Sequence, residues 1–177
     1  MRKNSRGFNL IELLIAVAIF SILVVMSIPS FNSLIARSRQ HDLARALVET
    51  MMIARSEAIK HNMRVNACPS RDLRTCSGGD DWENGWIVYR AINETRNLDV
   101  EEEPLHVVSG GTFGNATARA NQGLPGYVSY VGSGWSQRLT GARLMGTIYV
   151  CTPGQNKIDV IMSGGGRPRV ERTNTSC

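Results

Sequence analysis

The pattern of apolar and polar positions divides the chain into three stretches. Nearly every position from 8 to 28 is apolar, with Asn9, Glu12 and two serines as the polar exceptions. From 29 to 62, apolar residues recur at helical spacing and charged residues fill the positions between them. Beyond residue 62 the pattern changes to short β-like runs separated by Gly, Pro, Asn and Asp. The sequence therefore predicts a long helix followed by a β-rich domain.

Residues 8–28 have the length and apolar character of a transmembrane helix. The basic residues Arg2, Lys3 and Arg6 precede them, which favours a cytoplasmic amino terminus with the remainder of the chain outside. A secretory signal peptide is the alternative, but its apolar region is usually shorter and ends at a small-residue cleavage site. Here the small residue, Gly7, precedes the apolar run. We therefore predict a single membrane span over 8–28.

The amphipathic stretch 29–62 is expected to continue the helix and to pack on the domain that follows. Its apolar positions fall near one helical face and comprise Phe31, Leu34, Ile35, Leu43, Leu47, Met51, Ala54 and Ala58. Met51 and Met52 should lie near the contact with the domain, where core packing is the expected role.

Residues 63–177 are expected to form a two-sheet, sandwich-like β domain, which makes the fold class α+β with the long helix packed on it. Gly, Pro and Asn residues separate the candidate strands. The expected strands are 63–68, 86–91, 105–108, 126–131, 147–151, 157–162 and 169–172.

Four cysteines lie beyond the apolar segment, where an exported domain meets an oxidising compartment. Four cysteines allow three pairings, and sequence alone does not choose among them. We favour Cys68 with Cys76 and Cys151 with Cys177, because each pair then closes one local loop. Reduced thiols or a metal site are the alternatives, although no CxxC pair or clustered histidine supports zinc.

The net charge of +5 is concentrated in the leader. Without residues 1–7 the side chains comprise 17 basic and 15 acidic groups, so the overall charge is a weak argument for an anionic partner. An acidic run at Asp99, Glu101, Glu102 and Glu103 lacks the spacing of a calcium loop and is expected to be a solvated charge run.

No motif for catalysis is present. The three histidines are scattered, and the chain lacks GxSxG, HExxH and Walker A sequences. We expect neither an enzyme nor a bound cofactor or metal. Trp82, Trp86 and Trp135 are expected to be core residues rather than ligand-stacking platforms.

Glu12 is an unusual residue within the apolar run, because an ionisable group in hydrocarbon costs about 2.5–3.5 kcal/mol unless it finds a partner. Basic residues, then Gly7, then Phe8, with Glu12 five places into the mature chain, resemble the prepilin signal of type IV pilins and type II secretion pseudopilins. The resemblance implies that a prepilin peptidase cuts between Gly7 and Phe8 and methylates the Phe8 amine. It also implies that Glu12 pairs with the amino terminus of a neighbouring subunit during assembly. An incidental glutamate in a membrane anchor is the alternative.

Later segments narrow the resemblance. ARSEAIKHNMRVNACPS from Ala54, DWENGWIVY from Asp81, and the elements YVGSGWS, GTIYVC and GRPR are similar to the FimT, FimU and GspH group of minor pilins and pseudopilins, and most to FimT. This resemblance implies a low-abundance filament subunit with a β-sandwich-like head.

The carboxy-terminal segment GGGRPRVERTNTSC carries the best candidate binding site. Pro168 should hold Arg167 and Arg169 in an extended display, Arg172 adds a third guanidinium, and Lys157 on the preceding strand widens the patch. Guanidinium groups can form bidentate bonds to phosphate oxygens. GRPR also resembles a Gly-Arg-x-Arg stretch of DNA-binding FimT members, which implies DNA binding. Ordinary surface charges, or ion pairs with neighbouring subunits, are the alternative.

Together these expectations describe a minor type IV pilin that binds extracellular double-stranded DNA without strong sequence preference and supports uptake in natural transformation. Its expected partners are DNA, other major and minor pilins and the prepilin peptidase. Its location would be the inner membrane with a periplasmic head, and then the pilus, near the tip. A structural minor pilin without DNA binding and a type II secretion pseudopilin are the rival hypotheses.

Overall fold

The computed structural model describes residues 9–91, 103–124 and 126–177, with the backbone alone described over 24–30. Gly7 and Phe8, the predicted cleavage and methylation positions, lie outside the described residues, as do Asp99, Glu101 and Glu102 of the acidic run. The chain divides into two compact units, one ending at Ile35 and the other spanning Ala36–Cys177. We call the second unit the head.

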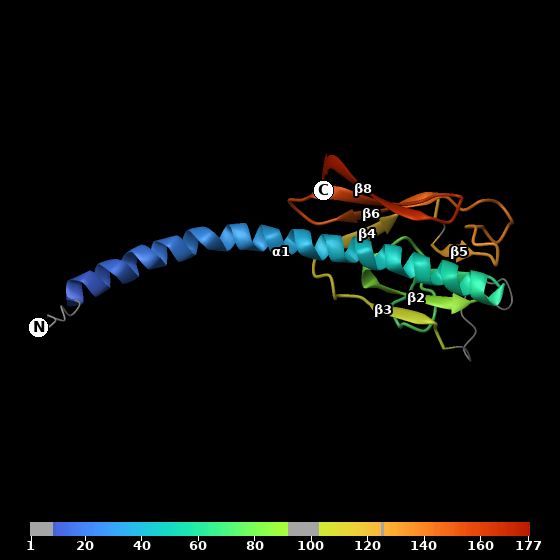
Figure 1. The fold of residues 1–177 in the computed structure, drawn as a ribbon, viewed down its shortest axis with the longest axis horizontal. Helices are drawn as coiled ribbons and strands as arrows, with labels where there is room; N and C mark the ends of the chain where they lie inside the picture. Colours follow the sequence, from blue (N-terminus) through green and yellow to red (C-terminus); the bar gives the residue numbers. More distant parts are fainter. Residues whose placement is uncertain (1–8, 92–102, 125) are drawn as a thin grey trace, which may run out of the picture. The chain divides into compact units, whose positions relative to one another are not determined.

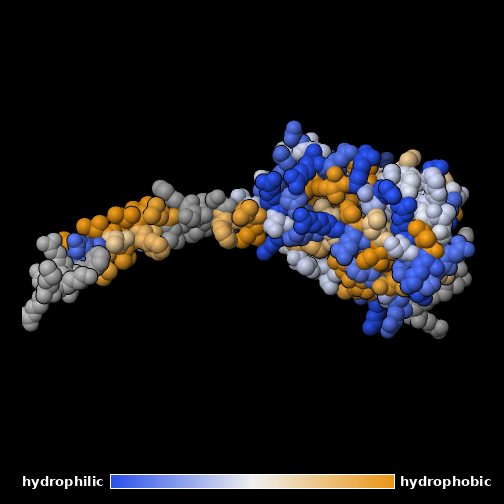
Figure 2. Space-filling view, in the orientation of Figure 1, coloured by the Kyte–Doolittle hydropathy of each residue, from blue (hydrophilic) through white to orange (hydrophobic). Residues whose placement is uncertain are grey.

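A single helix, α1, runs from Leu10 to His61 (Figure 1). Its described residues before Ile35 expose large apolar side chains, including Leu10, Phe20 and Leu23 (Figure 2). Within the described residues, no helix meets the combined requirement of length and apolar character for crossing a membrane. The predicted span 8–28 falls partly on residues that are not described.

The head contains eight described strands and one short 3-10 helix, all following α1. They are β1 (Val65–Pro69), η1 (Trp82–Asn84), β2 (Gly85–Arg90), β3 (His106–Ser109), β4 (Thr117–Ala120), β5 (Val128–Tyr130), β6 (Gly146–Cys151), β7 (Asn156–Met162) and β8 (Pro168–Ser176). All seven predicted strands are present. The prediction missed β4 and ended the last strand four residues too early, at 172 instead of 176.

The strands form two antiparallel sheets, ordered β3-β2-β1-β5 and β4-β6-β7-β8. Figure 1 shows β4, β6 and β8 on one side of the carboxy-terminal part of α1, with β2 and β3 on the other. The predicted α+β class, with two sheets packed on a helix, is confirmed.

Side chains from α1 and from both sheets share one core. The helix contributes Leu43, Leu47, Met51, Ala54 and Ala58, which are fully buried and lie three or four residues apart. Met52 points elsewhere and is 45% exposed, so the expectation that it lies at the contact was wrong. Among the residues whose side chains are described, every buried hydrophobic one belongs to the head, which therefore carries its own core.

Two buried polar side chains tie α1 to the two sheets. Gln40 Nε2 donates to the carbonyls of Val150 and Asn156, at 2.9 Å each, and so holds the helix against the β6–β7 hairpin. Thr50 Oγ1 accepts a 2.8 Å hydrogen bond from the indole N–H of Trp86 on β2. Because these groups are buried, losing one partner leaves the other unsatisfied.

Replacing Thr50 by Val should therefore destabilise the head. The change keeps the shape of the side chain but leaves the Trp86 N–H buried without its acceptor, at a cost of about 1–3 kcal/mol. Urea unfolding of a fragment beginning at Ala36 measures the loss. Thr112→Val is the matched control, because the Thr112 hydroxyl is exposed and its bond within the described residues is to the Ser109 carbonyl. Equal unfolding midpoints for the two variants would contradict a structural role for the Thr50–Trp86 bond.

Candidate functional site

The predicted basic segment forms β8, the edge strand of its sheet. β8 pairs only with β7 among the described strands, and most of its residues are exposed. Its carboxy-terminal end is held in two ways: the Cys177 N–H donates to the Gln155 carbonyl at 3.0 Å, and a disulfide joins Cys177 to Cys151, with their Cα atoms 5.5 Å apart. The segment is thus a fixed strand and not a loose tail.

Arg167 lies in the tight turn that leads into β8. The Gly166 N–H donates to the Ser163 carbonyl at 2.9 Å, and the Ser163 hydroxyl donates to the Arg167 carbonyl at 3.1 Å. Gly166 adopts φ of 77°, and a Cβ there would collide with the Gly134 carbonyl. Only glycine fits this position comfortably. The turn therefore holds the backbone of Arg167 in place while its side chain is exposed.

Register divides the predicted arginines between the two faces of β8. Arg169 lies opposite Ile161, whereas Arg172 lies opposite the buried Ile158. Directly opposed residues of an antiparallel pair project to the same face. Arg169 therefore projects to the outer face of the sheet, and Arg172 projects to the inner side, toward α1. The four predicted DNA contacts do not form one patch.

On the outer face, acidic residues accompany the predicted cations. Arg169 Nε lies 2.9 Å from Glu171 Oε1, and Lys157 Nζ lies 3.3 Å from Asp159 Oδ1. Lys157 also sits 4.3 Å above the centre of the Tyr149 ring. Asp159 and Glu171 are opposite one another in the register. Of the predicted residues on this side, Arg167 alone has no carboxylate at ion-pair distance within the described chain.

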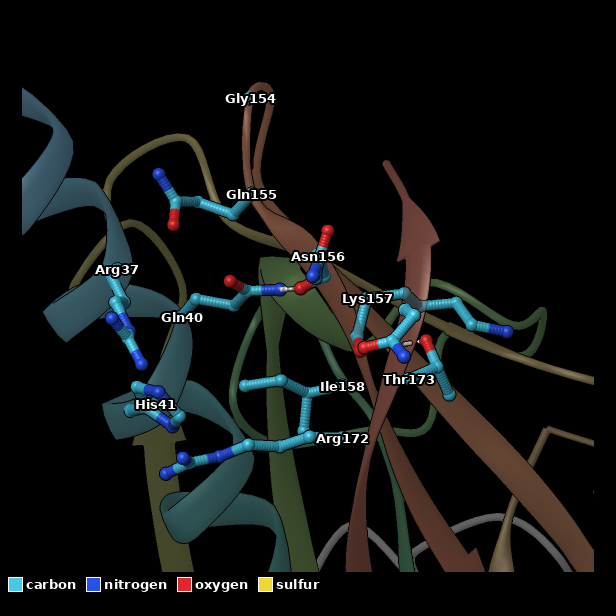
Figure 3. A pocket seen from close by; sticks show the side chains of 11 residues that line it. Arg37, Gln40, His41, Gly154, Gln155, Asn156, Lys157, Ile158, Arg172 and Thr173 are labelled. Atoms are coloured by element: carbon cyan, nitrogen blue, oxygen red, sulfur yellow. Dashed lines mark hydrogen bonds between the residues drawn. The ribbon is translucent and has the colours of Figure 1, made fainter.

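On the inner side, Arg172 lines a pocket between β8, the β6–β7 turn and α1. The pocket has a volume of about 410 Å³, and α1 contributes Arg37, Gln40 and His41 to its wall. Figure 3 shows His41 between Arg37 and Arg172, while the Lys157 amine points away. We call this pocket the α1–β8 groove. Its described lining residues include no aspartate or glutamate.

His41 reports a positive local field in the groove. Its partial burial, followed by the charges of Arg172, Arg37 and Arg45, lowers the pKa of His41, and Asp42 opposes this shift. The sequence analysis treated the three histidines as scattered and did not single out Arg37. The i, i+4 spacing places Arg37 and His41 on one helical face, but nothing in the sequence brings that face to β8.

Trp135 corrects a further expectation. Trp82 and Trp86 are fully buried, as predicted, but Trp135 is 45% exposed and the prediction that it belongs to the core was wrong. Arg143 lies over its ring at 4.2 Å from the centroid, a cation–π contact that covers one face of the indole.

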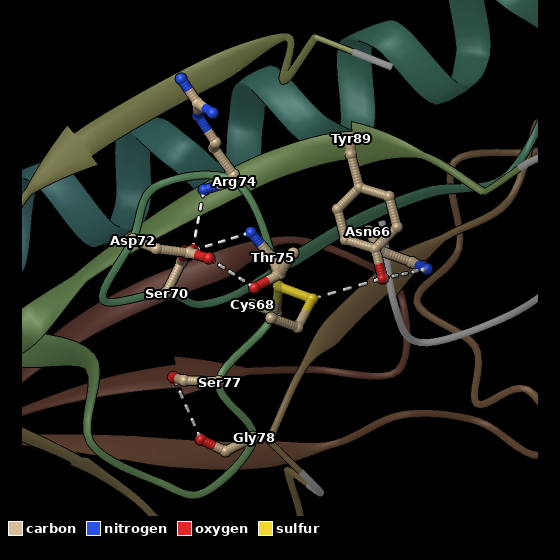
Figure 4. The surroundings of a disulfide bond; sticks show 10 residues. Asn66, Cys68, Ser70, Asp72, Arg74, Thr75, Ser77, Gly78 and Tyr89 are labelled. Carbon is tan, nitrogen blue, oxygen red and sulfur yellow. Dashed lines mark hydrogen bonds between the residues drawn. A yellow bond between two sulfur atoms is a disulfide. The ribbon is translucent and has the colours of Figure 1, made fainter. Parts of the chain in front are cut away.

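The first disulfide joins Cys68 to Cys76, so both bonds follow the pairing favoured from the sequence. Asp72 organises the loop that the Cys68–Cys76 bond closes (Figure 4). Its carboxylate accepts hydrogen bonds from the backbone N–H groups of Thr75 and Arg74 and from the hydroxyls of Thr75 and Ser70. The Thr75 N–H first, and then these other donors, hold the pKa of Asp72 well below its usual range. The loop covers a second cluster around Ile87, Tyr89 and Tyr127.

Glu12 lies in the first turn of α1, where its carboxylate accepts a 3.0 Å hydrogen bond from the Asn9 N–H. Such a contact satisfies one of the free donors at a helix amino terminus. Metal-binding clusters of His, Cys, Asp or Glu are absent from the described parts of the chain.

Comparison with protein families gives two matches. Residues 43–166 match the type II transport protein GspH family, and residues 2–28 match the prokaryotic N-terminal methylation motif. The first match covers most of the head and the second covers the leader and the apolar run.

Individual relatives are fimbrial proteins of Dichelobacter nodosus. One type IV major fimbrial protein FimA is 36% identical over 125 residues, which cover 67% of this chain and 73% of that protein. Another FimA is 36% identical over 78 residues, covering 44% of this chain and 46% of that protein, so this match spans about half the length of the relative.

Among solved structures, the Pseudomonas aeruginosa type IV minor pilin FimU in one crystal form matches with a TM-score of 0.60 at 17% identity, over 80% of this chain and 97% of FimU. A second crystal form of FimU gives a TM-score of 0.54. At this identity the likeness concerns the fold alone.

Removing the Cys151–Cys177 disulfide should loosen β8. A bond that closes a loop of this length contributes about 3 kcal/mol, chiefly by restricting the unfolded chain, and here it also holds the end of an edge strand. In Cys151→Ser/Cys177→Ser we expect faster amide hydrogen exchange along 169–176. Cys68→Ser/Cys76→Ser is the control, with faster exchange expected in its own loop. Unchanged β8 exchange in the first variant would show that pairing with β7 suffices.

Proposed function

The chain belongs to the GspH family of pilins and pseudopilins, and from this premise we propose that it is a minor subunit of a type IV pilus whose head binds duplex DNA. Fimbrial proteins among its relatives, at 36% identity, favour the pilus. The DNA would be bound outside the cell, without strong sequence preference, in support of uptake during natural transformation.

One observation carries the DNA proposal: the exposed edge strand β8 is held at both ends and presents Arg167 and Arg169 at its start. A preformed surface loses less conformational entropy on binding than a flexible tail does. Guanidinium groups suit phosphate oxygens because their N–H donors match two acceptors at once. Strand β8 has few apolar groups that would read base edges, so backbone contacts should dominate.

The balance of charge on the outer face limits the affinity. Glu171 and Asp159 reduce the field of Arg169 and Lys157. With about three or four phosphate contacts, the logarithm of the binding constant should fall with the logarithm of salt concentration at a slope of about −3. Binding of this kind is modest.

Assembly would depend on the other unit of the chain. The large apolar side chains from Leu10 to Ile22 are exposed, and a surface of this kind belongs in a bilayer or against other helices. We infer that residues 8–28 anchor the precursor in the inner membrane with the head in the periplasm. The prepilin peptidase would then cut before Phe8 and methylate it, and the helix would join those of other pilins, near the pilus tip.

A type II secretion pseudopilin is the second candidate, because the matched family is described as a type II transport protein. Deleting the gene and scoring piliation, transformation and secretion separately discriminates the two. Loss of secretion alone would favour the pseudopilin, and loss of piliation with normal transformation of any remaining piliated cells would favour a structural minor pilin.

Loss of the two exposed arginines should weaken DNA binding. In the full chain in nonionic detergent, Arg167→Gln/Arg169→Gln removes about two phosphate contacts, so we expect a salt slope shallower by about 2 and an affinity reduced about tenfold. Fluorescence anisotropy with a labelled duplex at two salt concentrations measures both quantities.

The matched control removes two exposed cations from other surfaces. Lys60→Gln/Arg74→Gln lowers the net charge equally but should change the affinity little. If both double variants weakened binding alike, the attraction would depend on net charge and not on β8. If the wild-type chain bound no duplex, the DNA proposal would fall.

Two substitutions of Glu12 separate its possible roles. Glu12→Gln keeps an oxygen that can accept from the Asn9 N–H but removes the charge, whereas Glu12→Ala removes both. If pairing with the amino terminus of a neighbouring subunit drives assembly, both variants should be depleted from sheared pili in an immunoblot. Normal incorporation of Glu12→Gln together with depletion of Glu12→Ala would assign Glu12 to helix capping instead. DNA binding by the purified chain should be unchanged in both.

A further inference from the structure

The α1–β8 groove gathers positive charge without a matching negative charge. Arg37 and His41 reach it from α1 and Arg172 reaches it from β8 (Figure 3). Neither Arg37 nor Arg172 has a carboxylate at ion-pair distance within the described residues, whereas the outer-face cations Arg169 and Lys157 each have one. Like charges held close together repel, so the folded head bears a cost that a bound anion would remove.

The walls of the groove are fixed before any ligand arrives. Buried Gln40 ties α1 to the carbonyls of Val150 and Asn156, next to the turn that closes the groove. The Cys151–Cys177 disulfide and the bond from the Cys177 N–H to the Gln155 carbonyl fix the end of β8 on the same turn. The fold thus sets the positions of the backbone at Arg37 and Arg172, and donors carried on fixed elements bind an anion at less entropic cost than donors on a flexible tail.

The remaining polar lining also suits an anion that bears several oxygens. Gln155, Asn156, Thr173 and Asn174 line the groove together with the two arginines. The three amide side chains offer N–H donors and the guanidinium groups offer forked pairs of donors. The Thr173 hydroxyl already donates to the Lys157 carbonyl at 3.0 Å. A tetrahedral phosphate group accepts from several directions at once, whereas an apolar ligand would leave these groups unpaired.

We propose that the α1–β8 groove is a phosphate-binding subsite of the DNA-binding surface, with Arg37 and Arg172 contacting backbone phosphates beyond those met by Arg167 and Arg169. This inference rests on the proposed DNA binding. It extends the contact surface from the start of β8, along the strand, to α1. It also gives Arg172 a role although it projects away from Arg169.

His41 supplies a signature that other surface arginines would not give. In the free chain the pKa of His41 is lowered, so the imidazole is mostly neutral near neutral pH. A phosphate in the groove favours the charged form and raises this pKa, so the complex holds more protons than the free chain. The affinity should therefore rise as pH falls from about 8 to about 6. The charged groups that face His41 are Arg37, Asp42 and Arg45 of α1 and Arg172 of β8, while the Lys157 amine of β7 points away.

The test compares five forms of the full chain in nonionic detergent: wild type, Arg37→Gln/Arg172→Gln, Arg37→Lys/Arg172→Lys, Arg167→Gln/Arg169→Gln, and the control Lys60→Gln/Arg74→Gln. A labelled duplex is titrated at two salt concentrations. The groove variant should bind about tenfold more weakly with a salt slope shallower by about 2. Arg37→Lys/Arg172→Lys should recover most of the slope because the charge is kept.

The outcomes separate this inference from the function beneath it. If the wild type binds and the groove variant matches it, while Arg167→Gln/Arg169→Gln is weak, the groove inference is overturned and DNA binding stands. If the wild type itself does not bind the duplex, both the proposed DNA binding and the proposed subsite are contradicted. If Arg37→Gln/Arg172→Gln binds weakly while Arg167→Gln/Arg169→Gln binds like the wild type, the subsite is supported and the groove makes the main contact with the duplex.

The pH dependence provides a second, independent check. Wild type should bind more tightly at pH 6 than at pH 8, and His41→Gln should remove this difference while folding normally, because His41 is partly exposed and belongs to no buried network. An unchanged pH dependence in His41→Gln would contradict a phosphate beside the imidazole.

Discussion

The head depends on the burial of one face of α1 between two sheets. Leu43, Leu47 and Met51 have no exposed surface, and they contribute to a core that also includes side chains from both sheets. Neither sheet could bury its inner face against a helix located elsewhere. The polar contacts of Gln40 and Thr50 add direction to this packing, because each must meet its own partner in one sheet. Hydrophobic burial provides the attraction, and the two polar side chains fix the position of the helix along its axis.

Local sequence patterns predict much of this arrangement. Helical spacing identified α1, and short β-like runs between turn residues identified seven strands, of which β1, β2, β6 and β7 bury apolar residues. β4 escaped notice because its buried residues, Ala118 and Ala120, are small and carry little strand signal. β8 was placed too short because it is an edge strand with mostly exposed polar residues, so alternation is weak. Trp135 was wrongly assigned to the core because a tryptophan in a small β domain is usually buried. Its exposure depends on the path of the loop that carries it.

The site was harder to predict than the fold. Its geometry depends on which face of β8 each position projects from, and on contacts between residues that are far apart in the sequence. Arg167, Arg169 and Arg172 look like one basic cluster in the sequence. Because Arg169 and Arg172 are three residues apart in one continuous register with β7, the alternation of β8 places Arg172 on the other face. The partners of Arg172 lie on α1, more than a hundred residues earlier in the chain. No local sequence pattern predicts that α1 and β8 lie side by side, since this follows from how the helix packs on the sheet β4-β6-β7-β8.

The contrast between the two faces of β8 explains why net charge is a poor guide to this protein. Beyond residue 7 the side chains are nearly balanced, with 17 basic and 15 acidic groups. On the outer face this balance is local, because Glu171 and Asp159 sit beside Arg169 and Lys157. In the α1–β8 groove positive charge is in excess, because arginines from α1 and from β8 line it. Asp42 only partly offsets their effect on the pKa of His41. Attraction for a phosphate depends on the field at the point of contact, and nearby counter-charges weaken it more than distant ones. Where the fold separates cations from carboxylates, an almost neutral head can still hold a polyanion.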